Sequence, residues 1–114
     1  MKPRSDGQTA KWVVMWTLPE GMDLEAWNDW YWNQHVPMAK KLPGLRRYTT
    51  TLVHRTVLGA PLYRMAEQYF DDVEALEAAV NSEIGAAVAD DAGPWVTDLS
   101  LYVTLEQEEG LSLG

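Results

Sequence analysis

The short apolar segment at residues 11–18 (KWVVMWTL) constrains the fold of this chain more than any other feature. Its even-numbered residues, beginning with Trp12, and its odd-numbered residues, beginning with Val13, are both mostly apolar. The two sets point to opposite sides of an extended strand, so the pattern predicts a strand that is buried on both faces. The sheet that contains this strand must therefore be covered on both sides.

Two helices and three further strands are predicted after this strand. Asp23, Asp71 and Ser82 are candidate caps at the starts of helical segments. A short loop at residues 59–61 joins two strands into an antiparallel hairpin. In chain order, the predicted elements are a helix at 23–42, a strand at 45–58, a strand at 63–70, a helix at 71–80, a short helical piece at 82–89 and a strand at 99–105.

The resulting order is βαββαβ, which predicts an α+β fold of the split βαβ type. Four antiparallel strands would form one sheet, with both helices on one face. The other face would be lined by alternating Trp, Val, Leu and Met residues, and an open apolar face of that size would not stay in water. We therefore expect a two-fold homodimer whose sheet faces meet and close into a barrel.

The segment at residues 27–44 (WNDWYWNQHVPMAKKLPG) concentrates aromatic side chains around a histidine. Tyr31 precedes His35 by about one helical turn and Trp27 precedes it by about two, so an aromatic row and an imidazole share one helix face. Pro37 cannot donate a backbone hydrogen bond and clashes with the preceding turn, so the helix should kink or restart there.

Composition excludes several classes of function. The chain has no cysteine, so it has no disulfide, thiol nucleophile or thiolate metal site. With two histidines and no HExxH or Asp-x-Asp motif, we expect no built-in metal site. The net charge of −8 argues against nucleic acid as a partner. The longest apolar run is too short to cross a membrane and the first ten residues carry no secretion signal, so we expect a soluble, cytoplasmic protein.

Charge is unevenly distributed along the chain. All nine basic residues lie within residues 1–64, and the remainder carries twelve acidic residues and no basic one. Residues 30–66 hold six Lys or Arg, two His and no carboxylate. Either the basic half pairs with the acidic half in the fold, or the basic region attracts an anion. Arg46, Arg47 and Arg55 either hold a substrate carboxylate or lie at the surface.

The length of 114 residues suits one domain with a single core. We expect this domain to span residues 11–106. Residues 1–10 would form a flexible N-terminal tail, and residues 107–114 a loose, acidic C-terminal tail.

Three motifs are similar to those of a known family: W-x-x-W-Y-x-x-x-H-V-P-M at 27–38, K-K-L-P-G-L-R-R-Y at 40–48 and A-E-x-Y-F-D-D-x-E-A-L at 66–76. Over most of residues 12–105 the chain resembles the EthD-like branch of the dimeric α+β barrel superfamily. The resemblance implies a ferredoxin-like fold, a dimeric barrel and a ligand pocket between the sheet and the helices. It does not imply one activity, because the family is named for an accessory protein of ether degradation, and the superfamily also holds lactone isomerases, polyketide cyclases and cofactor-free monooxygenases.

His35, Tyr48 and His54 are the candidate catalytic residues. An imidazole is a natural general acid and base near neutral pH, although His35 could instead bond a backbone carbonyl freed by the proline. The resemblance favours catalysis, since lactone-isomerase relatives use a histidine before V-P and have a pocket tyrosine similar to Tyr48. Strand periodicity puts Tyr48 and His54 on one face. If that face meets the helices, the three side chains converge; if it meets the barrel, two of them lie in the dimer interface.

Five further residues are candidate substrate contacts: Trp16, Trp27, Trp30, Tyr31 and Glu67. Any single tryptophan is more often core than ligand contact, but six in one small domain suit a flat aromatic ligand. Trp27 and Tyr31 would floor the pocket beside His35. Glu67 is either a buried carboxylate that acts as a base or the ion-pair partner of an arginine on a neighbouring strand.

The leading hypothesis is a cofactor-independent isomerase, cyclase or dehydratase-type lyase. It would act on a small cyclic or aromatic compound, lactone or polyketide-like, by proton transfer through His35. One alternative is an accessory protein that binds a small hydrophobic ring compound without turnover. The other is a cofactor-free monooxygenase that acts on a phenol.

Overall fold

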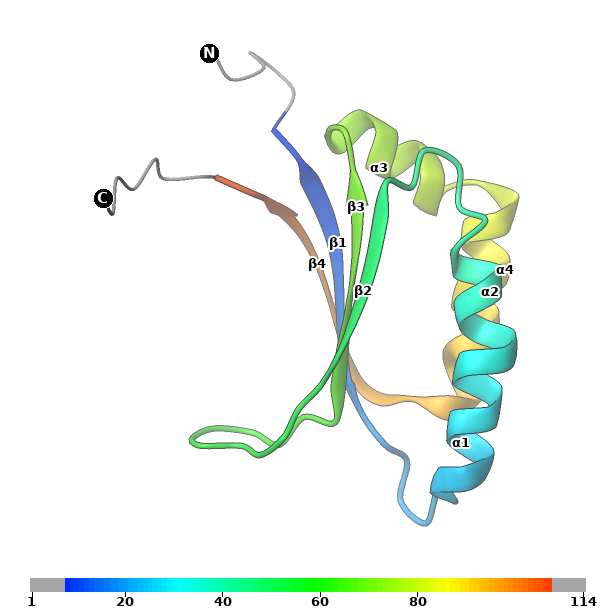
Figure 1. Cartoon of the computed structure of the whole chain (residues 1–114), viewed down its shortest axis with the longest axis vertical. Helices are drawn as coiled ribbons and strands as arrows, with labels where there is room; N and C mark the ends of the chain where they lie inside the picture. The colour runs from blue at the N-terminus through cyan, green and yellow to red at the C-terminus, as the bar shows by residue number, and fades with distance from the viewer. Residues whose placement is uncertain (1–7, 108–114) are drawn as a thin grey trace.

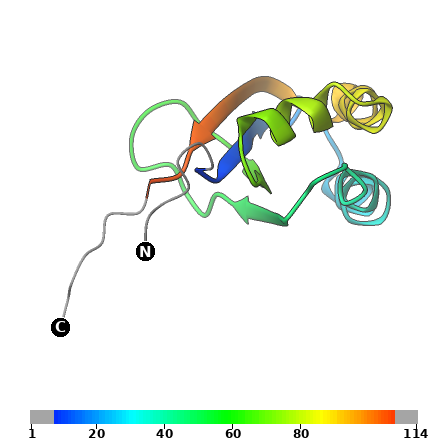
Figure 2. The same ribbon diagram turned by 90° about the horizontal axis from the view of Figure 1, so that it is seen from above.

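In the computed structural model, which describes residues 8–107, a four-stranded antiparallel sheet carries all its helices on one face (Figures 1 and 2). The strand order is β2–β3–β1–β4, and the predicted ferredoxin-like α+β arrangement is confirmed. The strands are β1 (Ala10–Thr17), β2 (Arg47–Leu52), β3 (Arg64–Phe70) and β4 (Thr97–Leu105). The helical segments are α1 (Leu24–Trp30), η1 (Tyr31–His35), α2 (Val36–Ala39), α3 (Val73–Val80), α4 (Glu83–Ala92) and η2 (Gly93–Trp95).

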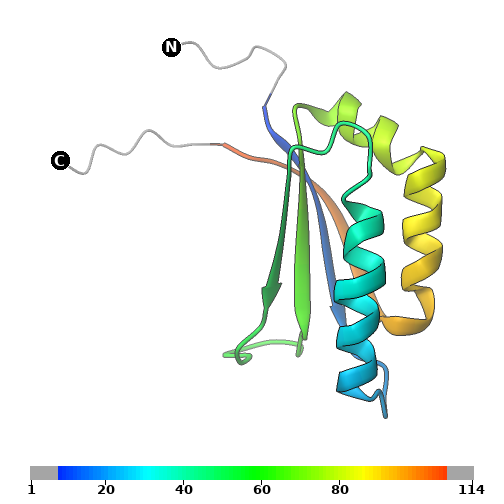
Figure 3. The same cartoon turned by 45° about the vertical axis from the view of Figure 1, so that its right-hand side comes forward.

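The first helix runs through α1, η1 and α2 without a break in its axis (Figures 1 and 3). Asp23 caps its start, as predicted, by accepting a hydrogen bond from the backbone N–H of Ala26. The disturbance expected near Pro37 takes the form of a π-helical turn, in which the N–H of Val36 donates to the carbonyl of Tyr31, five residues back. In a π-turn the hydrogen bond joins residues five apart in place of the four of an α-helix. Such turns occur frequently at functional sites.

The second strand is shorter than the sequence predicts. It ends at Leu52, which pairs with Arg64, the first residue of β3, and beyond this pair the N–H of Val53 donates to the carbonyl of Tyr63 before the chain enters the loop. This hairpin loop is exposed, and Leu58 keeps 94% of its accessible surface. The expected strand over 53–58 is therefore wrong, and His54 lies in the exposed loop.

The register of the sheet decides which side chains meet the helices. Trp12 pairs with Gln68, and Gln68 pairs with Tyr48. Paired residues of antiparallel strands lie side by side on the same face, and these three face the helices. The open face carries Val13, Met15, Met65, Glu67 and Tyr69 together with threonines. It is thus less apolar than predicted, because the tryptophans and leucines of the strands lie on the helix-facing side.

Two hydrophobic clusters fill the space between the sheet and the helices. The first consists of Ala10, Leu42, Phe70, Leu76 and Ala79. The second, which is rich in aromatic rings, consists of Trp16, Trp27, Trp30, Tyr31 and Ala66. The clusters lie towards opposite ends of the strands. The space between the sheet and the helices near the middle of the strands belongs to neither cluster.

The second half of the chain contributes α3 and α4, which Ser82 separates by capping α4 as predicted. Asp72, one residue after the predicted Asp71, caps α3 by accepting from the N–H of Ala75. α4 extends to Ala92, three residues further than predicted, and runs beside the first helix (Figure 3). Within residues 8–107 no helix has the length and apolar character needed to cross a membrane. Most of both predicted tails, residues 1–7 and 108–114, lies outside the described residues.

Candidate functional site

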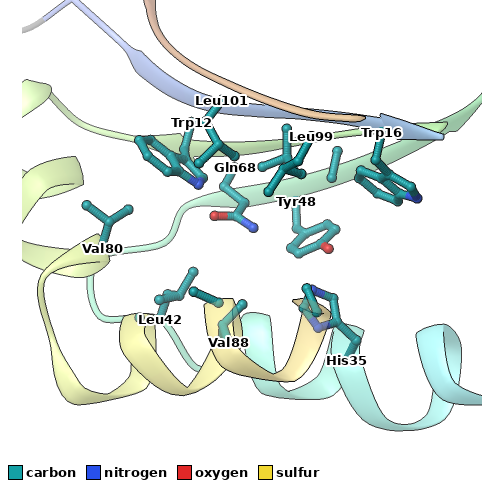
Figure 4. Close-up of a pocket in the computed structure, with 15 residues that line it drawn as sticks. Trp12, Trp16, His35, Leu42, Tyr48, Gln68, Val80, Val88, Leu99 and Leu101 are labelled. Atoms are coloured by element: carbon teal, nitrogen blue, oxygen red, sulfur yellow. The ribbon is translucent and has the colours of Figure 1, made fainter. Parts of the chain in front are cut away.

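A pocket of about 160 Å³ lies between the sheet and the helices, in the space between the two hydrophobic clusters (Figure 4). Its walls are mostly apolar and come from β1, β4 and α4, with Trp12, Trp16, Val88, Leu99 and Leu101 prominent among them. The polar side chains in its lining are His35, Tyr48 and Gln68. Because the polar groups are few and the walls apolar, the lining is typical of a small-molecule site.

His35 ends the π-turn and is buried, with 9% of its surface exposed. Its Nδ1 atom lies 3.0 Å from Oδ2 of Asp91 on α4, and its ring lies against that of Trp30, with centroids 4.8 Å apart. The ring therefore has a carboxylate on one nitrogen and the pocket beside it.

Asp91 accepts three side-chain hydrogen bonds from the first helix. The donors are the indole N–H of Trp30 at 2.9 Å, the amide of Gln34 and the imidazole of His35. Partial burial opposes ionisation, but these three bonds together hold the pKa of Asp91 below its ordinary value. The carboxylate is thus ionised at neutral pH and is fixed in place.

Burial lowers the pKa of His35 below its ordinary value, although the hydrogen bond and the charge of Asp91 act in the opposite direction. The imidazole is therefore neutral at pH 7. A neutral imidazole that donates its Nδ1–H to a carboxylate has an unprotonated Nε2. His35 is consequently a base with an orienting partner, an arrangement that general-base catalysis requires.

Tyr48 approaches the same pocket from the sheet, and Figure 4 shows its ring pointing towards that of His35. Burial, and then the neighbouring hydroxyl of Tyr31, raise the pKa of Tyr48 far above its ordinary value, while a hydrogen-bonding contact with Gln68 opposes the shift. The phenol stays protonated and can donate a hydrogen bond. One pocket thus holds a neutral base and a neutral donor.

The predicted aromatic substrate contacts separate into two groups. Trp16 lines the pocket. Trp27 and Tyr31 stack on each other in the core, with centroids 4.7 Å apart, and neither lines the pocket. Trp30 stacks on Trp95 at 4.9 Å and holds Asp91 through its N–H. These three rings support the site from behind, because they are packed against one another and leave no room for a ligand between them.

His54 and Glu67 do not join this site. His54 lies in the hairpin loop, beyond the end of the strand whose periodicity placed it beside Tyr48. Glu67 is on the open face of the sheet, where its Oε2 atom lies 3.2 Å from Nζ of Lys11. Its partner is therefore a lysine rather than the arginine expected.

Several residues of this site were not singled out from the sequence: Asp91, which is bonded to His35 behind the pocket, and in the pocket lining Gln68 and the residues of α4 and β4. Nothing local distinguishes Asp91 from Asp90, and only the packing of α4 against the first helix brings it to His35. Gln68 could have been found, because it is a polar residue at a position that the strand alternation makes inward-facing. Among residues 8–107, no cluster of three or more His, Asp or Glu side chains is arranged to hold a metal ion.

The profile of the EthD domain matches residues 19–98, which is more than half of the chain. The chain belongs to the EthD family. An EthD family protein from Bacillus halodurans has a similar structure, with 32% sequence identity and a TM-score of 0.77. The similarity covers 87% of this chain and 99% of that one. None of the curated proteins compared with this chain matches it significantly.

Two more distant proteins share the fold of this EthD-family chain. A hydroxynitrile lyase from Passiflora edulis is 12% identical, with a TM-score of 0.71 over 90% of this chain and 97% of that one. A cofactor-independent oxygenase from Streptomyces nogalater is 12% identical, with a TM-score of 0.65 over 92% and 99%. Ferredoxin-like neighbours from other bacteria are described as dimeric, including one from Thermobifida fusca that is 11% identical, with a TM-score of 0.66 over 92% and 97%.

Proposed function

We propose that this EthD-family protein is a cofactor-independent enzyme that transfers a proton on a small ring compound. The observation that carries the proposal is His35, a buried neutral imidazole that Asp91 orients beside an apolar pocket. An oriented base next to a cavity is the arrangement that proton abstraction needs.

The dimensions of the pocket define the class of substrate. An apolar cavity of roughly 150 Å³ holds a benzene molecule, so a pocket of about 160 Å³ suits one ring with a small substituent. The indoles of Trp12 and Trp16 offer flat apolar surface to such a ring. Gln68 and Tyr48 provide the polar contacts that would orient a carbonyl or hydroxyl group.

The proposed step begins with removal of a proton from the substrate by Nε2 of His35. Where the proton comes from a carbon, the electron pair left behind moves to a neighbouring carbonyl oxygen, which accepts a hydrogen bond from the Tyr48 hydroxyl. Where it comes from a hydroxyl, the pair on that oxygen forms a carbonyl as the bond to the leaving group breaks, and the leaving group departs with the electrons of that bond. Asp91 stabilises the imidazolium, and His35 then returns the proton to another atom of the substrate or to a leaving group. Return to another carbon is isomerisation, and expulsion of a leaving group is a lyase reaction.

The comparison with the Passiflora edulis hydroxynitrile lyase suggests a first substrate to try, mandelonitrile, which is an aromatic hydroxynitrile of about the right size. Cleavage would be followed by the absorbance of the benzaldehyde that is released. A panel of single-ring phenols, aryl ketones and unsaturated lactones would be screened in parallel. Oxygen consumption on the phenols would separate the oxygenase alternative, which the Streptomyces nogalater neighbour supports, from proton transfer without oxygen.

The decisive variant is His35→Gln, with His54→Gln as its matched control. General-base catalysis contributes on the order of a hundredfold to ten-thousandfold, so we expect kcat to fall by that factor in His35→Gln while ligand binding is retained. The exposed His54 should be replaceable with at most a twofold change. Unchanged turnover in His35→Gln would sink the proposal. Binding of panel compounds without any turnover would identify the protein as a small-molecule-binding accessory protein.

We also propose that the protein is a homodimer through the open faces of its sheets. Met15 and Met65 pair with each other near the middle of this face, which no helix covers. Apolar groups there would be removed from water by a second copy. The dimeric ferredoxin-like neighbour from Thermobifida fusca supports this assembly.

A further inference from the structure

A second concave surface lies outside the pocket, along the edge strand β2. We call it the β2 groove, and its lining includes Trp32, Lys40, Arg46, Tyr48 and Thr50. It lies between β2 and the first helix. Tyr48 lines both the groove and the pocket, so its side chain separates the two. The groove has no part in the proton transfer proposed above, and neither His35 nor Asp91 lines it.

The groove carries positive charge without local carboxylates. Its lining includes Lys40, Arg46 and Arg47 but no Asp or Glu. Arg46 has an ion pair with Asp71, but at 3.8 Å and with both side chains more than half exposed, so it neutralises little of the charge. Arg47 stacks over the ring of Tyr69. In a chain of net charge −8, this is a local region that attracts rather than repels anions.

A buried arginine lies directly behind the wall of this groove. Arg64 is 6% exposed and donates from a terminal nitrogen to the hydroxyl of Thr50, at 3.1 Å. Its Nε atom has no hydrogen-bond partner, and no carboxylate of residues 8–107 lies within ion-pair distance of it. Burying a cation without a counter-ion is costly, even when aromatic rings partly compensate.

Aromatic rings surround this guanidinium. Four of them, from Trp27, Tyr31, Trp32 and Tyr63, have centroids 5.2 to 5.7 Å from its central carbon. Trp32 differs from the other three because it also lines the groove and keeps 45% of its surface exposed. The exposed indole of Trp32 thus lines the same groove as the cations of Lys40 and Arg46, with the buried cation of Arg64 behind it. The guanidinium of Arg47 lies instead over Tyr69, on the open face of the sheet.

From this arrangement we infer that the β2 groove binds a small aromatic carboxylate, with the ring against Trp32 and the carboxylate between Lys40 and Arg46. The buried charge of Arg64 adds to the attraction, because little water separates it from the groove wall. An uncharged ring would gain only the contact with Trp32, and inorganic anions would gain only the charges. The groove therefore discriminates in favour of a ligand that has both parts.

The test is isothermal titration of the full chain with 2-naphthoate and with its uncharged analogue 2-naphthylmethanol, at low ionic strength. We expect the carboxylate to bind the wild type at least tenfold more tightly than the alcohol. The double variant Lys40→Gln/Arg46→Gln should weaken binding of naphthoate about tenfold, since it removes two charge contacts. Backbone amide shifts would map the bound probe to residues 40–50.

The control is Lys41→Gln/Arg55→Gln, which removes the same two charges from exposed positions outside the groove. It should change the dissociation constant by no more than twofold. Equal weakening by the two double variants, equal affinity for the alcohol or an absence of saturable binding would each overturn the inference. Val88→Trp, which fills the pocket and lies outside the groove, should bind naphthoate as the wild type does, so a failure of the proposed catalysis would leave this result intact. Loss of naphthoate binding in Val88→Trp would place the probe in the pocket and refute the groove site.

Discussion

Nδ1 of His35 lies 3.0 Å from Oδ2 of Asp91, although the two residues are 56 positions apart in the chain. The first helix provides the imidazole and α4 provides the carboxylate, so the contact exists only where these two helices pack together on the sheet. Trp30 and Gln34 donate to the same carboxylate, which makes Asp91 the point where the two helices are joined by polar bonds. The properties of His35 therefore depend on a residue of the opposite half of the domain.

Replacing Asp91 by asparagine should lower the pKa of His35 further. Burial already lowers this pKa, and the hydrogen bond and charge of Asp91 are what oppose the shift. The change also weakens three hydrogen bonds, so we expect the free energy of unfolding to fall by about 1–3 kcal/mol. Titration of the histidine ring signals by NMR measures the first effect, and urea denaturation measures the second.

Asp90→Asn is the matched control, because Asp90 is the exposed neighbour of Asp91 on α4. It should leave both the His35 titration and the stability near their wild-type values. A rise in the His35 pKa in Asp91→Asn would contradict the geometry described for the pair.

The stability of the protein should decrease on the acid side in two separate pH ranges. The folded pKa of His35 is below its ordinary value of 6.5, so the unfolded chain takes up this proton first and stability falls as the pH drops below about 6.5. The folded pKa of Asp91 is below its ordinary value of 3.8, so its contribution is lost only at lower pH. His35→Gln should flatten the plot of unfolding free energy against pH between about 5 and 7.

The acid-side loss below about pH 3.8 should remain in His35→Gln, because Asp91 keeps its hydrogen bonds from Trp30 and Gln34. If His35→Gln kept the wild-type slope below about pH 6.5, the imidazole would not be buried in its neutral form.

Much of this fold follows from local sequence signals. Asp23 and Ser82 each accept a hydrogen bond from a backbone N–H three residues further along the chain, so these caps can be predicted from local sequence. The residue pattern of β1 likewise indicates a strand that is buried on both faces. These elements were therefore predicted near their observed positions. The end of β2 was not predicted correctly. The strand stops at Leu52 because this residue pairs with the first residue of β3, which the sequence of β2 does not indicate. His54 was misplaced for this reason.

The site was less accessible from the sequence than the fold. His35 and Tyr48, which line the pocket, were candidates from the sequence, the first because of its aromatic helix and the second because of the family resemblance, and their catalytic role stays a prediction. Trp27 and Tyr31 share a helix face with His35, but periodicity does not say whether a face meets a cavity or other rings, and here they stack on each other. Asp91 requires knowledge of how two helices pack, which no local pattern encodes.

Gly85 should tolerate no side chain. A Cβ atom there would lie 2.5 Å from the carbonyl oxygens of Ala79 and Val80, so the turn between α3 and α4 would have to shift. We expect Gly85→Ala to lower the free energy of unfolding by about 1–3 kcal/mol. Gly93→Ala is the control, because a Cβ there meets nothing within 4 Å, and it should change stability by less than about 0.5 kcal/mol. Urea denaturation of the two variants gives the comparison, and equal values would show that the turn is free to move.

The dimer proposed through the open sheet face should dissociate when a charge is placed on that face. Met15→Lys puts an ammonium group beside Met65 on this face, and burying it would cost more than the interface gains. Sedimentation velocity at micromolar concentration should then show a monomer in place of the wild-type dimer. Leu24→Lys, on an exposed position of α1, should remain dimeric. A monomeric wild type would dismiss this interface.

The location of the pocket between the two hydrophobic clusters has a consequence for the evolution of the family. Val88, Leu99 and Leu101 line the pocket but belong to neither cluster, so they contribute little to the contacts that hold the sheet to its helices. A lineage can exchange them one at a time and alter the shape of the cavity while both clusters stay intact. The shape of the pocket proposed as the ligand site can therefore be changed without loss of the fold.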